Sequence, residues 1–218
     1  MKKLIFLFVI GISLASCAQN RPEQQGSLEQ DHISKNLDSL QVAYFASGCF
    51  WCVEAVYESV EGVQEAVSGY SGGVIKNPTY EQICTGRLEH AEAVKVYYDS
   101  SIVSYSILVD VFFNSHDPST RNAQGPDRGP QYRSIAFYMN DAERTIIDAK
   151  ISALKKVKMH SSITTQVKKF DVFYDAEDYH QDYERLHPDQ GYIQGVSVPR
   201  LNKFKKKMPE VLKSSGKH

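Results

Sequence analysis

The order of the predicted elements in this chain indicates an α+β fold, a two-layer α/β sandwich of ferredoxin-like type with helices packed on a mixed sheet. Of the 218 residues, 42% are apolar and 23% are charged, which is ordinary for a globular domain. Strand-like and helix-like segments alternate as β-α-β twice, and a further helix and strand follow. Beyond about residue 175 the pattern weakens, so we expect a long irregular C-terminal segment that wraps the sheet.

The first β-α-β unit starts with an apolar strand. Residues 42–46 are apolar and end at Ser47 and Gly48, which are typical of a turn. The apolar positions of the following helix share one face: Val53, Val56, Tyr57 and Val60. We expect Gly62 to end that helix and residues 63–70 to form the second strand.

The second β-α-β unit is interrupted by a long loop. Residues 91–98 alternate well enough for a strand, and a helical face begins after Ser104, an acceptable N-cap. Residues 114–131 are rich in glycine and proline and are expected to be loop, and a loop of that length is usually functional or disordered. Residues 132–139 are expected to form the next strand.

One more helix and strand follow this unit. Asn140 with Glu143 three residues later indicates a helix start. Residues 167–174 are expected to form the last strand. We interpret the lysine-rich stretch at residues 203–207 as a solvated face.

The N-terminus is expected to be a targeting segment. Two lysines precede an apolar run at residues 4–14, which is too short for a comfortable membrane span and has the length of a signal-peptide core. Small residues then precede Cys17, an arrangement that resembles the lipobox of bacterial lipoproteins. The resemblance implies a signal peptide over residues 1–16 and a lipid on Cys17. A plain secretory signal and a buried N-terminal helix are the alternatives.

The segment after Cys17 is expected to be a tether. Residues 17–41 comprise the lipidated cysteine and a polar stretch whose flexible chain would reach roughly 25–30 Å, ahead of a domain over residues 42–218. We therefore expect a membrane-anchored lipoprotein of the cell envelope, on the periplasmic or extracytoplasmic side, held to the membrane by its lipid alone. The net charge of −1 leaves no basic footprint for nucleic acid.

Two cysteines mark the predicted active site. Cys49 falls where the first strand passes to a helix, and a helix N-terminus stabilises negative charge, so the Cys49 thiol is expected to lose its proton more easily. Cys52 is three residues further on the same side of the first turn, within reach of a disulfide to Cys49.

Several interpretations of these cysteines remain open at this point. They could be two small buried residues, or they could bind zinc together with Cys84 and His90. A thioredoxin-type disulfide oxidoreductase is a further alternative. A zinc deaminase is excluded by the order of its motifs. In those enzymes the H-x-E motif precedes the C-x-x-C motif, whereas here Cys49 and Cys52 precede His90-Ala91-Glu92.

The chain resembles the A-type peptide-methionine sulfoxide reductases. The resemblance covers residues 42 to about 195 and is specific because several segments match in order. The matching segments are Gly48-Cys49-Phe50-Trp51-Cys52, Gly69-Tyr70-Ser71-Gly72-Gly73, Asn77-Pro78-Thr79-Tyr80, His90-Ala91-Glu92-Ala93-Val94, Asn114-Ser115-His116-Asp117-Pro118, Gln131-Tyr132-Arg133-Ser134 and Glu177-Asp178-Tyr179-His180-Gln181.

The resemblance implies reduction of the S epimer of methionine sulfoxide, free or in proteins. Sulfoxide reduction needs a nucleophile for sulfur and an acid for oxygen, because oxide is a poor leaving group. The implied roles are Cys49 as nucleophile, Glu92 as acid, Tyr80 and Tyr132 as donors to the sulfoxide oxygen, Asp127 as a supporting loop carboxylate, and Phe50 and Trp51 as the hydrophobic box for the methyl group.

The resemblance also implies how the enzyme is recycled. The first half-reaction would leave Cys49 as a sulfenic acid, and Cys52 matches the resolving cysteine of one subgroup. Cys84 is the alternative resolver. A thioredoxin-like reductant would reduce the Cys49–Cys52 disulfide, with no metal or organic cofactor. We interpret His116 and His180 as structural.

Overall fold

The structure, a computed structural model, describes residues 37–157 and 162–214. The predicted signal peptide, Cys17 and most of the predicted tether lie outside the described residues. In the described ranges, every helix is too short or too polar to cross a membrane.

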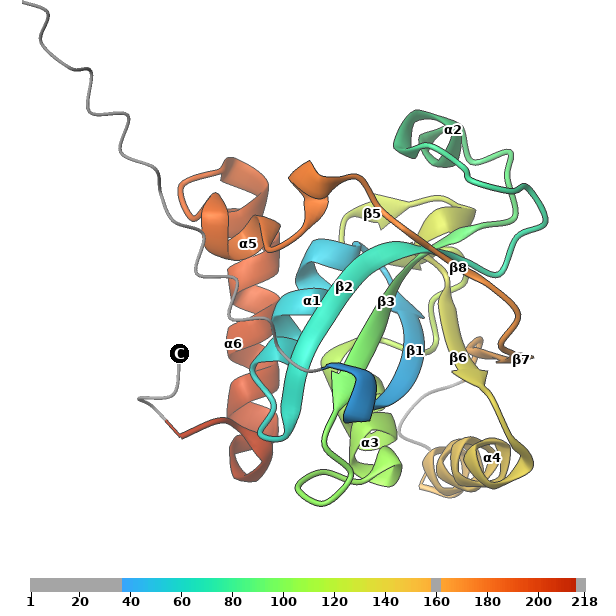
Figure 1. The fold of residues 1–218 in the computed structure, drawn as a ribbon, viewed down its shortest axis with the longest axis vertical. Helices are drawn as coiled ribbons and strands as arrows, with labels where there is room; N and C mark the ends of the chain where they lie inside the picture. Colours follow the sequence, from blue (N-terminus) through green and yellow to red (C-terminus); the bar gives the residue numbers. More distant parts are fainter. Residues whose placement is uncertain (1–36, 158–161, 215–218) are drawn as a thin grey trace, which may run out of the picture. The chain divides into compact units, whose positions relative to one another are not determined.

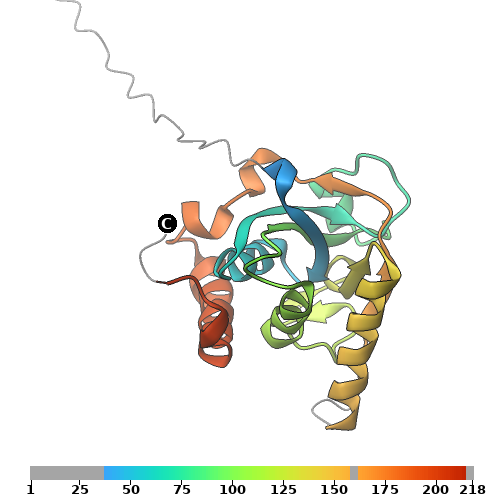
Figure 2. The same ribbon diagram turned by 60° about the horizontal axis from the view of Figure 1, so that its bottom comes forward.

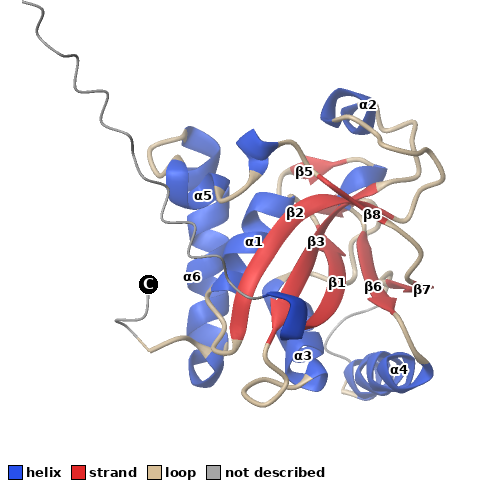
Figure 3. Ribbon diagram, in the orientation of Figure 1, coloured by secondary structure: helices blue, strands red, loops and turns tan. Residues whose placement is uncertain are grey.

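The fold is mixed α/β, built on a curled mixed sheet (Figures 1 and 3). Its strands, in spatial order, are β7 (Gln166–Lys169), β6 (Ser134–Tyr138), β1 (Gln41–Ser47), β3 (Ala91–Tyr98), β2 (Val63–Ser71) and β8 (Phe173–Asp175). Neighbouring strands are antiparallel except β6 and β7, which are parallel. The strands predicted at residues 42–46, 63–70, 91–98 and 132–139 are confirmed as β1, β2, β3 and β6.

Helices cover one face of this sheet. The helices are α1 (Phe50–Glu58), α2 (Tyr80–Cys84), α3 (Tyr105–Ser115), α4 (Asp141–Lys156), α5 (Tyr183–Leu186) and α6 (Val198–Lys207). α1 packs on β2 and β3, and α6 packs against both α1 and α3. α4 lies beside α3 at the β6 edge, as Figure 2 shows. The main core lies between these helices and the sheet, where Phe45 of β1 stacks on Tyr57 of α1 and contacts Phe112 of α3.

The caps predicted for two helices are present. Ser104 accepts a hydrogen bond from the Ile107 backbone N–H at 3.3 Å, and Asn140 accepts one from the Glu143 N–H at 3.0 Å. Each cap satisfies a backbone N–H group that has no partner inside its helix, which explains why α3 and α4 begin at these residues.

The strand predicted over residues 167–174 is wrong as a single strand. β7 and β8 lie at opposite edges of the sheet, and the chain between them crosses the face that the helices leave uncovered (Figure 1). There Phe170 stacks on Tyr44 with ring centroids 3.7 Å apart. Six flat strands would put the two edges about 24 Å apart, whereas the chain from Lys169 to Phe173 spans at most about 14 Å. The sheet must therefore curl.

Two further expectations need correction. The predicted loop at residues 114–131 contains a short hairpin of β4 (Ala123–Gln124) and β5 (Asp127–Arg128), which turns at Gly125 with a φ of 56°. The C-terminal segment includes the regular helix α6, whose pattern is hard to recognise because lysines surround its buried Phe204. Lys203, Lys206 and Lys207 are exposed there, consistent with a solvated face.

Candidate active site

Cys49 stands at the turn between β1 and α1. β1 ends at Ser47, Gly48 takes a left-handed φ of 96°, and Cys49 caps the N-terminus of α1. A Cβ atom on Gly48 would lie 2.7 Å from the Cβ of Gln124, so glycine is required in this turn. The predicted position of Cys49 at a helix start is therefore confirmed.

A cavity of about 260 Å³ opens beside Cys49. Seven of its nine lining residues are predicted site residues: Cys49, Phe50, Trp51, Tyr80, Glu92, Asp127 and Tyr132. The other two, Gln190 and Tyr192, come from the C-terminal segment, where no motif pointed to them. Cys52 is buried behind the cavity wall, with its sulfur 3.8 Å from the Tyr192 hydroxyl oxygen. The fold thus gathers a thiol, carboxyl groups, phenols and an aromatic wall at one place.

Glu92 is the buried acid of this cavity. It lies on β3, is 2% exposed, and accepts a hydrogen bond of 3.0 Å from the backbone N–H of Phe50 at the start of α1. Burial raises the pKa of Glu92 to about 8, because desolvation outweighs the stabilising hydrogen bond from Phe50. At neutral pH the carboxyl therefore carries a proton that it can donate.

Three phenols and a carboxylate surround the rest of the cavity. Tyr80 begins α2, and Tyr132 ends the 3₁₀ turn Pro130–Tyr132. Burial raises the pKa of both phenols, so their hydroxyls remain neutral donors. The Tyr192 hydroxyl donates to Asp127 Oδ2 at 2.7 Å. Burial also raises the pKa of Asp127, against the lowering effect of that hydrogen bond.

Comparison with known proteins identifies the family of this chain. Residues 41–212 match the family described as peptide methionine sulfoxide reductase. The chain belongs to this family. The peptide methionine sulfoxide reductase MsrA 1 of Rhodopirellula baltica is 48% identical over 177 residues, which cover 81% of this chain and 92% of the relative. The MsrA of Saccharolobus solfataricus is 45% identical over 174 residues, covering 80% and 98%.

Solved structures of reductases from the same family share the fold. The crystal structure of Mxr1 from Saccharomyces cerevisiae in reduced form matches with a TM-score of 0.64 and 33% identity, covering 69% of this chain and 87% of that chain. Methionine sulfoxide reductase A of Corynebacterium diphtheriae matches with a TM-score of 0.62 and 32% identity, covering 68% and 76%.

The pKa values of the two cysteines at the start of α1 are shifted in opposite directions. Both are free thiols. Burial raises the pKa of Cys49, and its hydrogen bond to Cys52 and the neighbouring Glu92 raise it further. The hydrogen bond from Cys49 lowers the pKa of Cys52 to about 6, with Arg200, Ser197 and Tyr192 acting in the same direction. The expectation that Cys49 loses its proton more easily is therefore wrong, because desolvation outweighs the effect of the helix N-terminus.

His180 fixes the position of Trp51, which forms the aromatic wall of the cavity together with Phe50. The indole N–H of Trp51 donates to His180 Nδ1 at 3.2 Å, and the Trp51 ring stacks on Tyr183 at 3.8 Å. Burial lowers the pKa of His180, so the neutral ring can accept this hydrogen bond. These contacts agree with a structural role for His180. His116 lies elsewhere, between the Phe112 carbonyl and the Ser134 hydroxyl.

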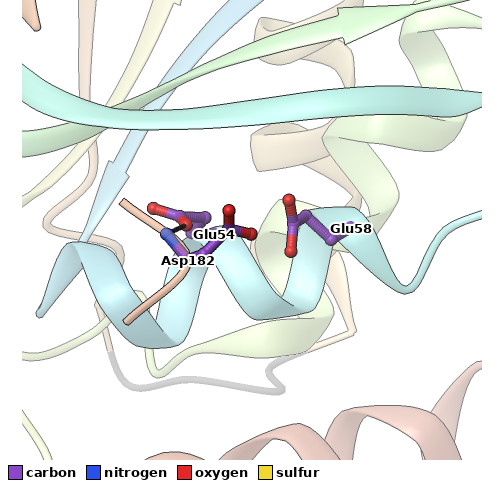
Figure 4. Close-up of side chains that lie close together, drawn as sticks. All are labelled: Glu54, Glu58 and Asp182. Atoms are coloured by element: carbon purple, nitrogen blue, oxygen red, sulfur yellow. Dashed lines mark hydrogen bonds between the residues drawn. The ribbon is translucent and has the colours of Figure 1, made fainter. Parts of the chain in front are cut away.

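A cluster of acidic side chains lies at α1, outside the residues that line the cavity. Figure 4 shows Glu54, Glu58 and Asp182 close together. Glu54 is 2% exposed and accepts hydrogen bonds from the Ser68 hydroxyl and the Asp182 backbone N–H. Burial raises the pKa of Glu54 to about 8. Glu54 therefore joins α1 to β2 and to the C-terminal segment, and this joining accounts for its burial.

The zinc alternative does not fit the geometry. Across residues 37–157 and 162–214, the acidic cluster is the group of potential metal ligands that comes together, and it contains no cysteine or histidine. His90 Nε2 instead contacts the Ile75 carbonyl at 2.8 Å. Cys84 is exposed at the end of α2 and does not line the cavity.

Proposed function

We propose that this chain reduces the S epimer of methionine sulfoxide, free or in proteins, and so repairs oxidised proteins. The observation that carries the proposal is the presence of a nucleophilic thiol, Cys49, and a protonated carboxyl, Glu92, in the same cavity. The chain is an oxidoreductase of the methionine sulfoxide reductase family, so the reaction class follows from its membership.

In the first half-reaction the cavity acts on sulfur and oxygen together. The Cys49 sulfur attacks the sulfoxide sulfur while Glu92 gives its proton to the oxygen, and the thiol proton of Cys49 restores the proton of Glu92. A bond forms between the two sulfurs and the S–O bond of the substrate breaks. The oxygen then bonds to the Cys49 sulfur as the bond between the two sulfurs breaks, so methionine leaves and Cys49 remains as a sulfenic acid. Tyr80 and Tyr132 donate hydrogen bonds to the oxygen, Asp127 holds Tyr192 in place, and Phe50 and Trp51 accept the methyl group.

In the second half-reaction Cys52 resolves the sulfenic acid. The Cys52 sulfur attacks Cys49, a disulfide forms, and the oxygen leaves as water. A thioredoxin-like reductant then returns both thiols by disulfide exchange. Cys52 is favoured over Cys84 because it lies on the first turn of α1, three residues from Cys49 and within its reach.

The domain is proposed to be ferredoxin-like and lipid-anchored. The order β6-β1-β3-β2 of the four central strands, with α1 and α3 between β-strands, supports the first point. The lipobox-like sequence ending at Cys17 supports the second, with residues 1–16 removed and the domain held at the extracytoplasmic side of a membrane. Loss of the protein from washed membranes on Cys17→Ser is the expected result, and full retention would contradict the anchor.

The activity is tested with the two separated epimers of a methionine sulfoxide peptide and dithiothreitol. We expect consumption of the S epimer only, and loss of turnover in Cys49→Ser. Persistence of the S epimer would overturn the proposal. Reduction of an unrelated protein disulfide without sulfoxide reduction would instead favour the thiol-disulfide oxidoreductase alternative.

A further inference from the structure

The C-terminal helix α6 brings a positive charge beside the turn that carries Cys49. Arg200 Nη2 donates to the Ser47 carbonyl at 2.9 Å and to the Ser47 hydroxyl at 3.2 Å, and its Nε donates to the Ser115 carbonyl at 2.9 Å. Its Nη1 would lie 3.3 Å from a Cβ atom placed on Gly48. The guanidinium is therefore fixed beneath the β1–α1 turn that carries Cys49.

The charge of Arg200 is not used in an ion pair within the described part of the chain. Its hydrogen-bond partners are two backbone carbonyls and a hydroxyl, all neutral, and no carboxylate there comes within salt-bridge distance. Its field reaches Cys52, Asp127 and Glu184, and at each of them it favours the ionised form and lowers the pKa. A half-buried cation without a close counter-ion stabilises a nearby anion more than an exposed one does.

We propose that Arg200 is a positioning residue for the resolving step, whose guanidinium holds the Cys52 sulfur as a thiolate next to Cys49. This inference rests on the proposed function and assigns the resolving half of the site to α6. The cavity residues act on the substrate at Cys49, whereas Arg200 acts behind the cavity wall on Cys52.

The surroundings of Cys52 agree with this role. The Ser197 and Tyr192 hydroxyls also lower the pKa of Cys52 by hydrogen bonding, and Ser197 precedes α6 at the end of the π-helical turn Ile193–Ser197. The titratable groups that face Cys52 are Cys49 on its own helix, Glu92 on β3, Tyr192 from the C-terminal segment and Arg200 on α6. Of these, Arg200 alone carries a positive charge.

The resolving step balances with these groups. The Cys52 thiolate attacks the sulfur of the Cys49 sulfenic acid, the S–S bond forms and the S–O bond breaks. The leaving oxygen takes a proton from Glu92 and departs as water, and Glu92 regains its proton from solvent. Cys52 enters this step as the thiolate, the form that its pKa of about 6 favours at pH 7.

The test follows resolution in a single turnover. Reduced enzyme is mixed with one equivalent of the S epimer, and quenched samples are analysed for released methionine, for sulfenic acid trapped by dimedone, and for the Cys49–Cys52 disulfide. In Arg200→Gln we expect resolution at pH 7 to slow about two- to tenfold, and to approach the wild-type rate near pH 9. The reason is that raising a pKa of about 6 by one to two units lowers the thiolate fraction at pH 7 from about 0.9 to between about 0.5 and 0.1. Arg200→Lys keeps the charge and should recover most of the rate.

Lys203→Gln is the matched control, since it removes a charge from an exposed position of the same helix, and its pH profile should equal that of the wild type. A second measurement does not require a stable Arg200 variant. In Cys49→Ser, where a hydroxyl replaces the hydrogen-bonding thiol, Cys52 should be alkylated by iodoacetamide with a pKa well below that of an ordinary thiol.

Two results would overturn the inference. One is an Arg200→Gln profile identical to that of the wild type, and the other is a Cys52 that titrates like an exposed cysteine in Cys49→Ser. If the wild type releases no methionine, the proposed function fails instead, so the two failures are distinguishable.

Discussion

Glu92 shows how a single side chain sets the pH range of the site. It is buried on β3, and its pKa is raised to about 8 mainly by desolvation. Cys49 is also neutral at pH 7, because burial raises its pKa. Glu92 and Cys49 are therefore both uncharged where they line the cavity, which suits a substrate that carries an apolar methyl beside a polar oxygen.

The role of Glu92 predicts both a rate loss and a change of pH profile. Glu92→Gln keeps an oxygen for the Phe50 N–H but cannot transfer a proton, so we expect methionine formation to slow by about 10²–10⁴-fold. In the wild type the single-turnover rate should fall as pH rises through about 8, where Glu92 ionises. Quenched single-turnover experiments from pH 6 to 10 measure both effects. If the rate of Glu92→Gln fell above pH 8 as the wild-type rate does, the result would contradict this role.

At the scale of elements, Glu54 joins three parts of the chain. It lies on α1 and accepts a hydrogen bond from Ser68 on β2. It also accepts one from the backbone of Asp182 ahead of α5, which lies beside it in Figure 4. Because its pKa is raised to about 8 in the folded state, the folded protein binds more protons than the unfolded chain between about pH 4.5 and 8. Stability is therefore fully present below this window and decreases as pH rises through it.

This linkage predicts a pH-dependent stability that Glu54→Gln reduces. One such group contributes at most about 1.4 kcal/mol per pH unit to the free energy of unfolding. Glu92 contributes with the same sign, so Glu54→Gln should remove about half of the combined slope between pH 5 and 8 in urea denaturation. Glu210→Gln makes the same chemical change at an exposed position and should leave the slope as it is. A slope in Glu54→Gln equal to that of the wild type would mean that Glu54 is not the protonated group.

Local elements could be predicted where the cause is local. The N-caps Ser104 and Asn140 and the alternation of β3 depend on neighbouring residues, and all three are present in the structure. The strand at residues 167–174 could not be predicted correctly, because its two ends pair with strands far away in sequence. In the sequence, Phe170 and Phe173 give the same apolar pattern whether they belong to one strand or to a segment that crosses a sheet face.

At the scale of the whole molecule, the site depends on distant segments meeting. The cavity takes residues from α1, α2, β3, β5, the turn before β6 and the C-terminal segment. The motif residues among them could be predicted from their resemblance to the family. Tyr192, Gln190 and Arg200 could not, because their roles come from the return of the C-terminal segment to the β1–α1 turn, and their local sequence does not indicate that contact.

The same long-range packing explains the division between the cysteines. Cys49 lines the cavity, whereas Cys52 is buried beside it and contacts the Tyr192 hydroxyl of the C-terminal segment, so neighbouring thiols at the start of α1 have different surroundings. Cys84, at the end of α2, interacts with the Tyr80 side chain but does not line the cavity, and it is expected to remain a thiol throughout the reaction.

The most direct test of the account is intact-mass and peptide analysis of reduced protein after one equivalent of the S epimer, with no reductant present. The account predicts one methionine per protein, the loss of two hydrogen atoms, a Cys49–Cys52 disulfide, and a free Cys84. A protein that forms no methionine, or that forms its disulfide through Cys84, would contradict it.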